Sequence, residues 1–138
     1  MTYVNIGNVY TMAPSEEDGE RILVDRLWPR GVTKDAARLS SWLKDLGPTP
    51  ELRKWFGHDP SRWEEFQGRY VRELQSSDKQ SLLRDLAEKS RNGAVTLLFA
   101  AKDRERNNAV VLKQLIGELA RKSAQASRTS RHPASRSV

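Results

Sequence analysis

The sequence of 138 residues contains no cysteine, and this absence excludes several kinds of site at once. Without thiols the chain cannot form a disulfide framework, a thiolate zinc site, an iron–sulfur cluster or a cysteine nucleophile. No apolar run approaches the roughly 20 residues that a membrane-spanning helix requires. The first residues lack the basic start and the apolar centre of a secretory signal peptide. We therefore expect a cytoplasmic protein that does not act in a membrane.

Motifs of cofactor chemistry are also missing. The sequence contains no GxGxxG, GxxxxGK, HExxH or GxSxG pattern. His58 is the only histidine before the last residues of the chain, so a catalytic triad and a histidine metal site have no support. We expect no cofactor and no metal, which leaves carboxylate acid–base chemistry, or binding without chemistry.

The material for one compact core is present. The mass of 15.7 kDa, with 37% hydrophobic and 30% charged residues, is typical of a single globular domain.

Positive charge is concentrated at one end of the chain. Residues 1–120 carry 19 Lys and Arg and all 18 acidic residues, whereas residues 121–138 carry five Lys and Arg and no acid. We expect a folded domain over residues 1–122 and a disordered basic tail over residues 123–138.

Strand and helix patterns alternate along residues 1–122. The pattern predicts strands at Tyr3–Tyr10, Arg21–Val24 and Ala94–Ala100, the first at an edge and the last buried on both faces. Helices are expected over Lys34–Leu39, over Pro50–Phe56 after an N-cap at Thr49, from Asp59 to Gln75, from Asp78 to Asn92, and from an Asp103 cap to Lys122. Residues Trp42–Leu46 fit either a strand or a continued helix. This order indicates an α/β fold with a small, mainly parallel sheet flanked by helices.

Polar residues follow two of these strands, where ligands of open α/β sheets usually bind. The first group is Asp25, Arg26, Trp28 and Arg30, with Gly31 allowing the chain to turn. The second group is Lys102, Asp103, Arg104, Asn107 and Asn108, at the expected start of a helix. If the two strands are adjacent and parallel, arginine forks, a lysine and helix amides face one crevice that suits a phosphate or a carboxylate. Asp25 and Asp103 are then the candidate catalytic acids or bases.

Each of these residues also has a structural interpretation. An aspartate at a strand end often only caps the next turn, and Asn107 and Asn108 could tie the preceding loops together. The default role of the four tryptophans is core packing, with Trp28, between Arg26 and Arg30, the best exception. We expect His58 to have a structural role in a turn.

The motifs ILVDRLWPRG at residues 22–31, LRKWF at 52–56 and LLFAAKD at 97–103 resemble the YeaO-like branch of the bacterial family named domain of unknown function 488. The resemblance extends over roughly residues 1–121 and adds Arg53 to the polar residues expected at the site. Many relatives have Asn-His-Ala where this chain has Asn107-Asn108-Ala109, and other branches carry cysteines that are absent here. The resemblance implies a compact α/β domain, and no imidazole or thiol mechanism is transferred with it.

Three functional hypotheses remain. The first is an anionic small molecule or nucleotide bound in the Arg/Lys/Asp crevice, with or without catalysis. The second is a nucleic-acid-associated or regulatory module that uses basic residues and the tail. The third is an interaction protein, which would require an exposed apolar patch. The sequence sets neither the ligand nor the oligomeric state.

Overall fold

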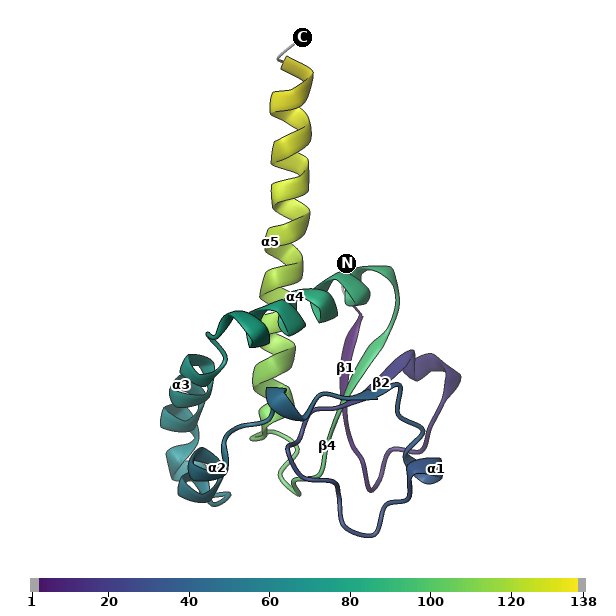
Figure 1. Ribbon diagram of the computed structural model, residues 1–138, viewed down its shortest axis with the longest axis vertical. Helices are drawn as coiled ribbons and strands as arrows, with labels where there is room; N and C mark the ends of the chain where they lie inside the picture. The colour runs from purple at the N-terminus through teal and green to yellow at the C-terminus, as the bar shows by residue number, and fades with distance from the viewer. Residues whose placement is uncertain (1–2, 137–138) are drawn as a thin grey trace.

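The computed structural model describes the backbone of residues 3–136 and the side chains of residues 3–123 (Figure 1). It is a single α/β domain whose sheet has the strand order β1-β4-β2-β3, with every neighbouring pair parallel. The strands are β1 (Val4–Asn8), β2 (Glu20–Leu23), β3 (Ser41–Trp42) and β4 (Val95–Phe99). Ile22 is in register with Leu97 and Leu23 with Leu98, which confirms the adjacent parallel strands expected from the sequence.

Four helices and three short 3-10 turns connect the strands along the described chain, and a fifth helix follows the last strand. The helices are α1 (Lys34–Ala37), α2 (Pro50–Phe56), α3 (Trp63–Glu73), α4 (Ser77–Asn92) and α5 (Asn108–Arg136), and the turns are η1 (Glu16–Asp18), η2 (Lys44–Leu46) and η3 (Pro60–Arg62). The predicted N-cap of α2 is present, because the Thr49 hydroxyl accepts a hydrogen bond from the Leu52 N–H, and Thr33 caps α1 in the same way through the Ala36 N–H.

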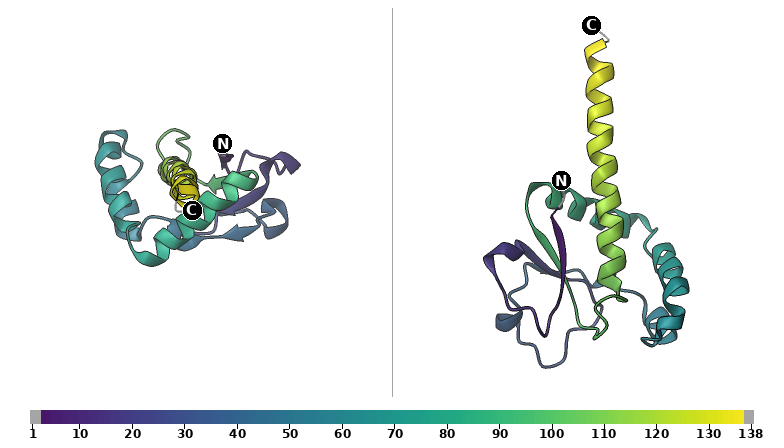
Figure 2. Two further views of the ribbon diagram at one scale, coloured as in Figure 1. Left: turned by 90° about the horizontal axis from the view of Figure 1, so that it is seen from above. Right: turned by 180° about the vertical axis from the view of Figure 1, so that it is seen from behind.

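The two faces of the sheet are covered differently. Leu97 and Phe99 belong to the main core, which includes buried side chains from α2 to α5. Leu98 faces the opposite side and packs with Val9 and Leu23 under loop residues. Because both faces are covered, all five residues of β4 are buried, as the nearly all-apolar pattern predicts. The views from above and behind show α5 crossing beside the strands and α4 (Figure 2).

A charged pair is buried on the face that carries Leu98. The Arg21 guanidinium lies 2.7 Å from an Asp18 carboxylate oxygen, and each side chain is 5% exposed. Arg21 Nε also donates to the Ala37 carbonyl, while the Asp18 carbonyl accepts from the Thr96 hydroxyl. This cluster ties η1 and α1 to the sheet, and no sequence motif identified it.

Four expectations need correction. The last helix does not begin at an Asp103 cap: Asp103 Oδ1 accepts from Glu105 and Arg106 N–H, and the Asn107 side chain instead accepts from Val110 N–H near the start of α5. The segment Trp42–Leu46 is neither a strand nor a continued helix over its whole length, since β3 ends at Trp42 and η2 follows. Trp42 is 37% exposed rather than part of the core.

The fourth correction concerns the end of the chain. The backbone is helical to Arg136, whereas residues 123–138 were expected to lack regular structure. Alanine, serine and arginine tolerate a helix, and α5 enters this stretch already formed, so propagation needs no new nucleus. Residues 137 and 138 lie outside the described residues. Among the described helices, none combines the length and apolar character needed to cross a membrane.

Candidate functional site

A cavity of about 380 Å³ opens where β2 and β4 end and α5 begins. Parallel strands place their carboxyl ends at one edge, and this edge brings residues 25–30 beside residues 100–108. Helices α2 and α3 close another side with Arg53, Phe56 and Phe66. Seven residues considered from the sequence line the cavity: Asp25, Arg26, Trp28, Arg30, Arg53, Asn107 and Asn108.

Asp25 is the only acidic residue lining the cavity. One of its carboxylate oxygens accepts the Ala100 backbone N–H at 2.9 Å, and the other accepts the Asn108 side-chain amide at 3.0 Å. Burial raises the pKa of Asp25, while the hydrogen bonds from Asn108 and Ala100 and the nearby Arg53 charge act in the opposite direction. Asp25 is thereby fixed between the ends of β2 and β4 as an oriented acceptor.

Buried hydrogen bonds of Asn108 and Tyr70 fix the structure around Asp25. The Asn108 amide also donates to the Val24 carbonyl at 2.9 Å, so one side chain joins β2 to the first residue of α5. Tyr70 is fully buried, and its hydroxyl donates to the Leu46 carbonyl. Burial raises the pKa of Tyr70 well above its ordinary value, so its hydroxyl remains protonated. Of these side chains, Asn108 and Asp25 line the cavity, so the Asn108 hydrogen bonds fix this part of its wall.

Four arginines line the cavity: Arg26, Arg30, Arg53 and Arg106. Arg26 Nε donates to the Pro48 carbonyl at 3.0 Å, and Arg106 pairs with Asp103 at 3.2 Å. Arg30 and Arg53 are exposed and take part in none of the ion pairs among the described side chains. The cavity therefore carries more positive than negative charge, although the net charge of residues 1–120 is only +1.

The loop after β2 is held by close backbone packing. A Cβ added to Gly47 would lie 2.7 Å from the Arg26 backbone nitrogen, so only glycine allows this approach. Trp28 Nε1 donates to the Val32 carbonyl at 2.7 Å, which closes the turn around Gly31. Gly31 has a φ of 79°, the left-handed conformation expected of a turn glycine.

The cavity also contains residues that the sequence did not indicate. Phe56 and Phe66 stack with centroids 4.5 Å apart, and Tyr10 donates its hydroxyl to the Arg30 carbonyl. His58 lines the cavity from a turn with a φ of 58°, which agrees with its expected turn role. The helical spacing of Phe56 and Phe66 indicated core packing, and no local signal distinguished a core aromatic from one that also borders a cavity.

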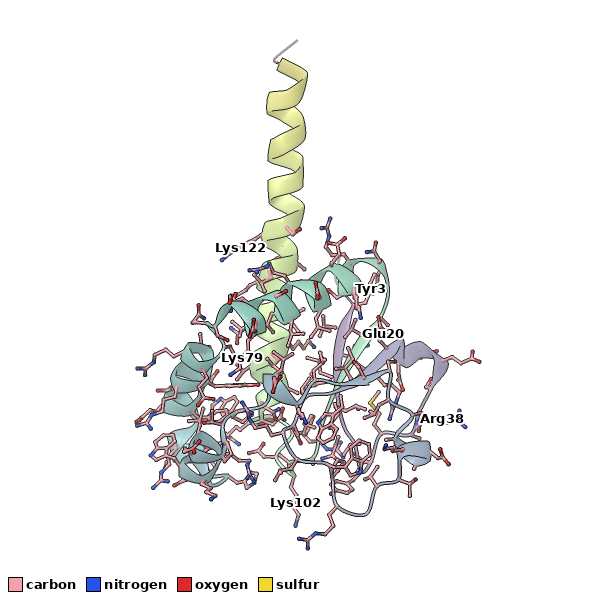
Figure 3. The ribbon with its side chains drawn as sticks, viewed as in Figure 1. Tyr3, Glu20, Arg38, Lys79, Lys102 and Lys122 are labelled. Carbon is pink, nitrogen blue, oxygen red and sulfur yellow. The ribbon has the colours of Figure 1, made fainter. Side chains whose placement is uncertain are left out.

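Three of the polar residues expected near the site, Lys102, Asp103 and Arg104, do not line the cavity. Lys102 is exposed, and Figure 3 shows its side chain directed outward at the end of the molecule where β4 finishes. Asp103 accepts hydrogen bonds from its own loop, and the Glu105 N–H contributes most to holding its pKa below the ordinary value. Arg104 instead contacts Thr11 at 3.3 Å. Among the described residues, no cluster of His, Asp and Glu is suited to a metal ion.

Comparison with known proteins assigns the chain to a family. Residues 3–135 match the family described as the inactive DUF488-N3 subclade. The chain belongs to the DUF488 family. This agrees with the resemblance found in the motifs at residues 22–31, 52–56 and 97–103.

Relatives in this family come from several bacteria. The uncharacterized protein Rv3073c of Mycobacterium tuberculosis is 42% identical over 115 residues, covering 83% of this chain and 94% of the relative. An uncharacterized protein of Mycobacterium bovis gives the same identity and coverage. The uncharacterized protein YeaO of Escherichia coli is 38% identical over 107 residues, covering 77% of this chain and 91% of YeaO. No solved structure matches this chain.

Proposed function

We propose that this protein binds a small anionic molecule in the cavity at the ends of β2 and β4 and performs no chemistry on it. The observation that carries the proposal is the lining itself, in which four arginines and a single carboxylate surround a cavity of about 380 Å³. Guanidinium groups donate paired hydrogen bonds to phosphate and carboxylate groups. The volume lies within the range usual for small-molecule sites, about 300 to 1,000 Å³.

Binding without catalysis fits the available acids. Asp103 lies outside the cavity lining and already accepts hydrogen bonds from its loop, so Asp25 is the one candidate carboxylate at the cavity, and His58 is the one imidazole of the lining. Acid–base catalysis commonly needs two groups that act together, but the described hydrogen bonds join Asp25 to the Ala100 N–H and to the Asn108 amide rather than to His58. The description of the matched subclade as inactive points the same way.

The test compares two variants, each of which replaces one cationic side chain by methionine. Arg53→Met removes an exposed cation from the cavity, and Lys102→Met removes an exposed cation outside it. Inorganic phosphate and nucleoside monophosphates would be titrated by calorimetry, with thermal melts recorded in parallel. Loss of a charge-assisted hydrogen bond costs about 1.5 to 3 kcal/mol, so Arg53→Met should weaken binding at least about tenfold while Lys102→Met leaves it unchanged.

Two results would count against the proposal. If no anion binds or raises the melting temperature of the parent protein, the cavity is not an anion site. If Lys102→Met weakens binding as much as Arg53→Met, the affinity comes from surface charge in general. Arg26→Met is less suitable as a primary test, because the lost hydrogen bond to the Pro48 carbonyl would also affect the fold.

A second candidate function is association with nucleic acid. Figures 1 and 2 show the end of α5 projecting beyond the rest of the domain, and the sequence from residue 121 onward carries five Lys and Arg and no acid. Such a segment can neutralise phosphates without reading the base sequence. This function would not use the cavity, so removal of the segment separates the two candidates.

A further inference from the structure

The walls of the cavity include more aromatic surface than binding of an inorganic anion would use. Trp28 approaches from the loop after β2, and Phe56 and Phe66 approach from α2 and α3. Phe56 and Phe66 are buried and stack on each other, whereas the partly buried Trp28 ring borders the cavity, and a phosphate or small carboxylate held by the arginines would not use it. Flat ligand rings pack favourably against aromatic side chains, and bases stack on them in single-stranded nucleic-acid sites. The lining therefore suits a ligand with both an anionic and a flat aromatic part.

The side chains that line the cavity differ in how exposed they are. Arg30 and Arg53 are exposed, whereas Asp25 is partly buried and Phe56 and Phe66 are buried. An anionic group near the two exposed arginines would remain partly hydrated, and the ring would lie deeper, against Trp28 and beside the stacked pair of Phe56 and Phe66. A cavity of about 380 Å³ is near the lower end of the range for small-molecule sites, so it suits one nucleotide rather than a dinucleotide.

Asp25 repels the anionic part of a ligand, so the group facing it must supply hydrogen-bond donors. Each of its carboxylate oxygens accepts one protein hydrogen bond and keeps further acceptor capacity. Guanine presents adjacent N1–H and N2–H donors on one edge, which match the two oxygens of a carboxylate. Adenine and cytosine place a ring acceptor next to their amino group, so one carboxylate oxygen would face a lone pair.

We propose that the ligand is a guanine mononucleotide whose N1–H and N2–H edge is read by Asp25 and whose phosphate lies at Arg30 and Arg53. This inference rests on the proposed function, because it assigns a ligand class to the same cavity. It adds base selectivity, which anion binding alone does not require.

The experiment titrates the full chain with GMP, inosine monophosphate, AMP and inorganic phosphate. Inosine monophosphate lacks only the N2 amino group, so it tests the Asp25 contact without changing the protein. We expect GMP to bind about tenfold tighter than inosine monophosphate and AMP, since one hydrogen bond contributes about that factor, and all three to bind tighter than phosphate. Asp25→Asn should remove the preference for GMP, and Lys102→Met should preserve it.

The outcomes separate this inference from the proposed function. Equal affinities for GMP, inosine monophosphate and AMP would overturn the assignment of guanine. GMP binding no tighter than phosphate would overturn the nucleotide assignment while leaving anion binding intact. If none of the four ligands binds, the proposed function fails and the inference fails with it. The comparison among ligands decides the question even if Asp25→Asn does not fold.

Discussion

The buried pair of Arg21 and Asp18 gives a prediction about stability that is independent of the cavity. Arg21→Met keeps much of the volume of the side chain and removes its charge. The Asp18 carboxylate, 5% exposed, would then retain the Ser15 backbone N–H as its described donor, and the Ala37 carbonyl would lose its bond from Arg21 Nε. Breaking a buried pair in this way costs about 3 to 5 kcal/mol.

That cost is large compared with the stability of the whole domain. A domain of this size has a free energy of unfolding of about 7 to 20 kcal/mol. With about 4 °C of melting temperature per kcal/mol, Arg21→Met should lower the melting temperature by roughly 12 to 20 °C. The assay is thermal and urea unfolding of the full chain, followed by circular dichroism.

The matched control is Lys89→Met. Lys89 pairs with Glu20 at 3.2 Å, but the two side chains are 48% and 41% exposed, so solvent screens the pair. Its loss should cost less than about 1 kcal/mol. A third variant combines Arg21→Met with Asp18→Asn and should be more stable than Arg21→Met alone, because no uncompensated charge remains buried. Equal effects of Arg21→Met and Lys89→Met would refute the reasoning, and so would a double variant less stable than Arg21→Met.

Two further predictions concern pH and the end of the chain. Burial raises the pKa of Asp25 in the folded state above its ordinary value of 3.8, so the folded state holds this proton more tightly than the unfolded state. The free energy of unfolding should therefore fall as pH rises from 3.8 through the folded-state pKa. Urea unfolding across this pH range should show that decrease in the parent protein and a smaller decrease in Asp25→Asn. Removal of residues 123–138 should shift the melting temperature by no more than a few degrees, because the bond between Arg91 and Ser123 that it deletes is exposed. If residues 123–138 bind nucleic acid, their three arginines should make the logarithmic salt slope of binding to duplex DNA steeper by up to about 2.7 in the full chain than in the truncated chain.

The regular elements of the fold could be predicted because each depends on a local pattern. Val95–Phe99 is apolar at every position except Thr96, and this composition is typical of a strand buried on both faces. Pro50 follows Thr49 and precedes Gly57, so the start and end signals of α2 lie within nine residues. Such signals depend on only one or two turns of chain, so they can be recognised without knowledge of the tertiary structure.

The errors arose where partners are distant in sequence or where two local signals compete. Asp103 and Asn107 both suit an N-cap, and only the three-dimensional path of the loop decides that Asn107 takes it. Lys102 follows β4 directly, but a side chain at a strand end can face either side of the sheet edge. The pair of Arg21 and Asp18 depends on η1 folding back over the sheet, which neither residue signals in the sequence.

Asn108 illustrates how the proposed site would bind a ligand without transferring a proton. Its amide donates to the Val24 carbonyl and to Asp25, so it fixes the end of β2 against the start of α5. The resemblance places a histidine at this position in many relatives, and an imidazole could both donate to Asp25 and exchange a proton with a ligand. An amide donates the same kind of hydrogen bond and exchanges no proton at neutral pH. The cavity of this chain therefore has an oriented carboxylate and arginines, which the proposed binding would use, and at position 108 it has an amide that holds the site in place without exchanging a proton.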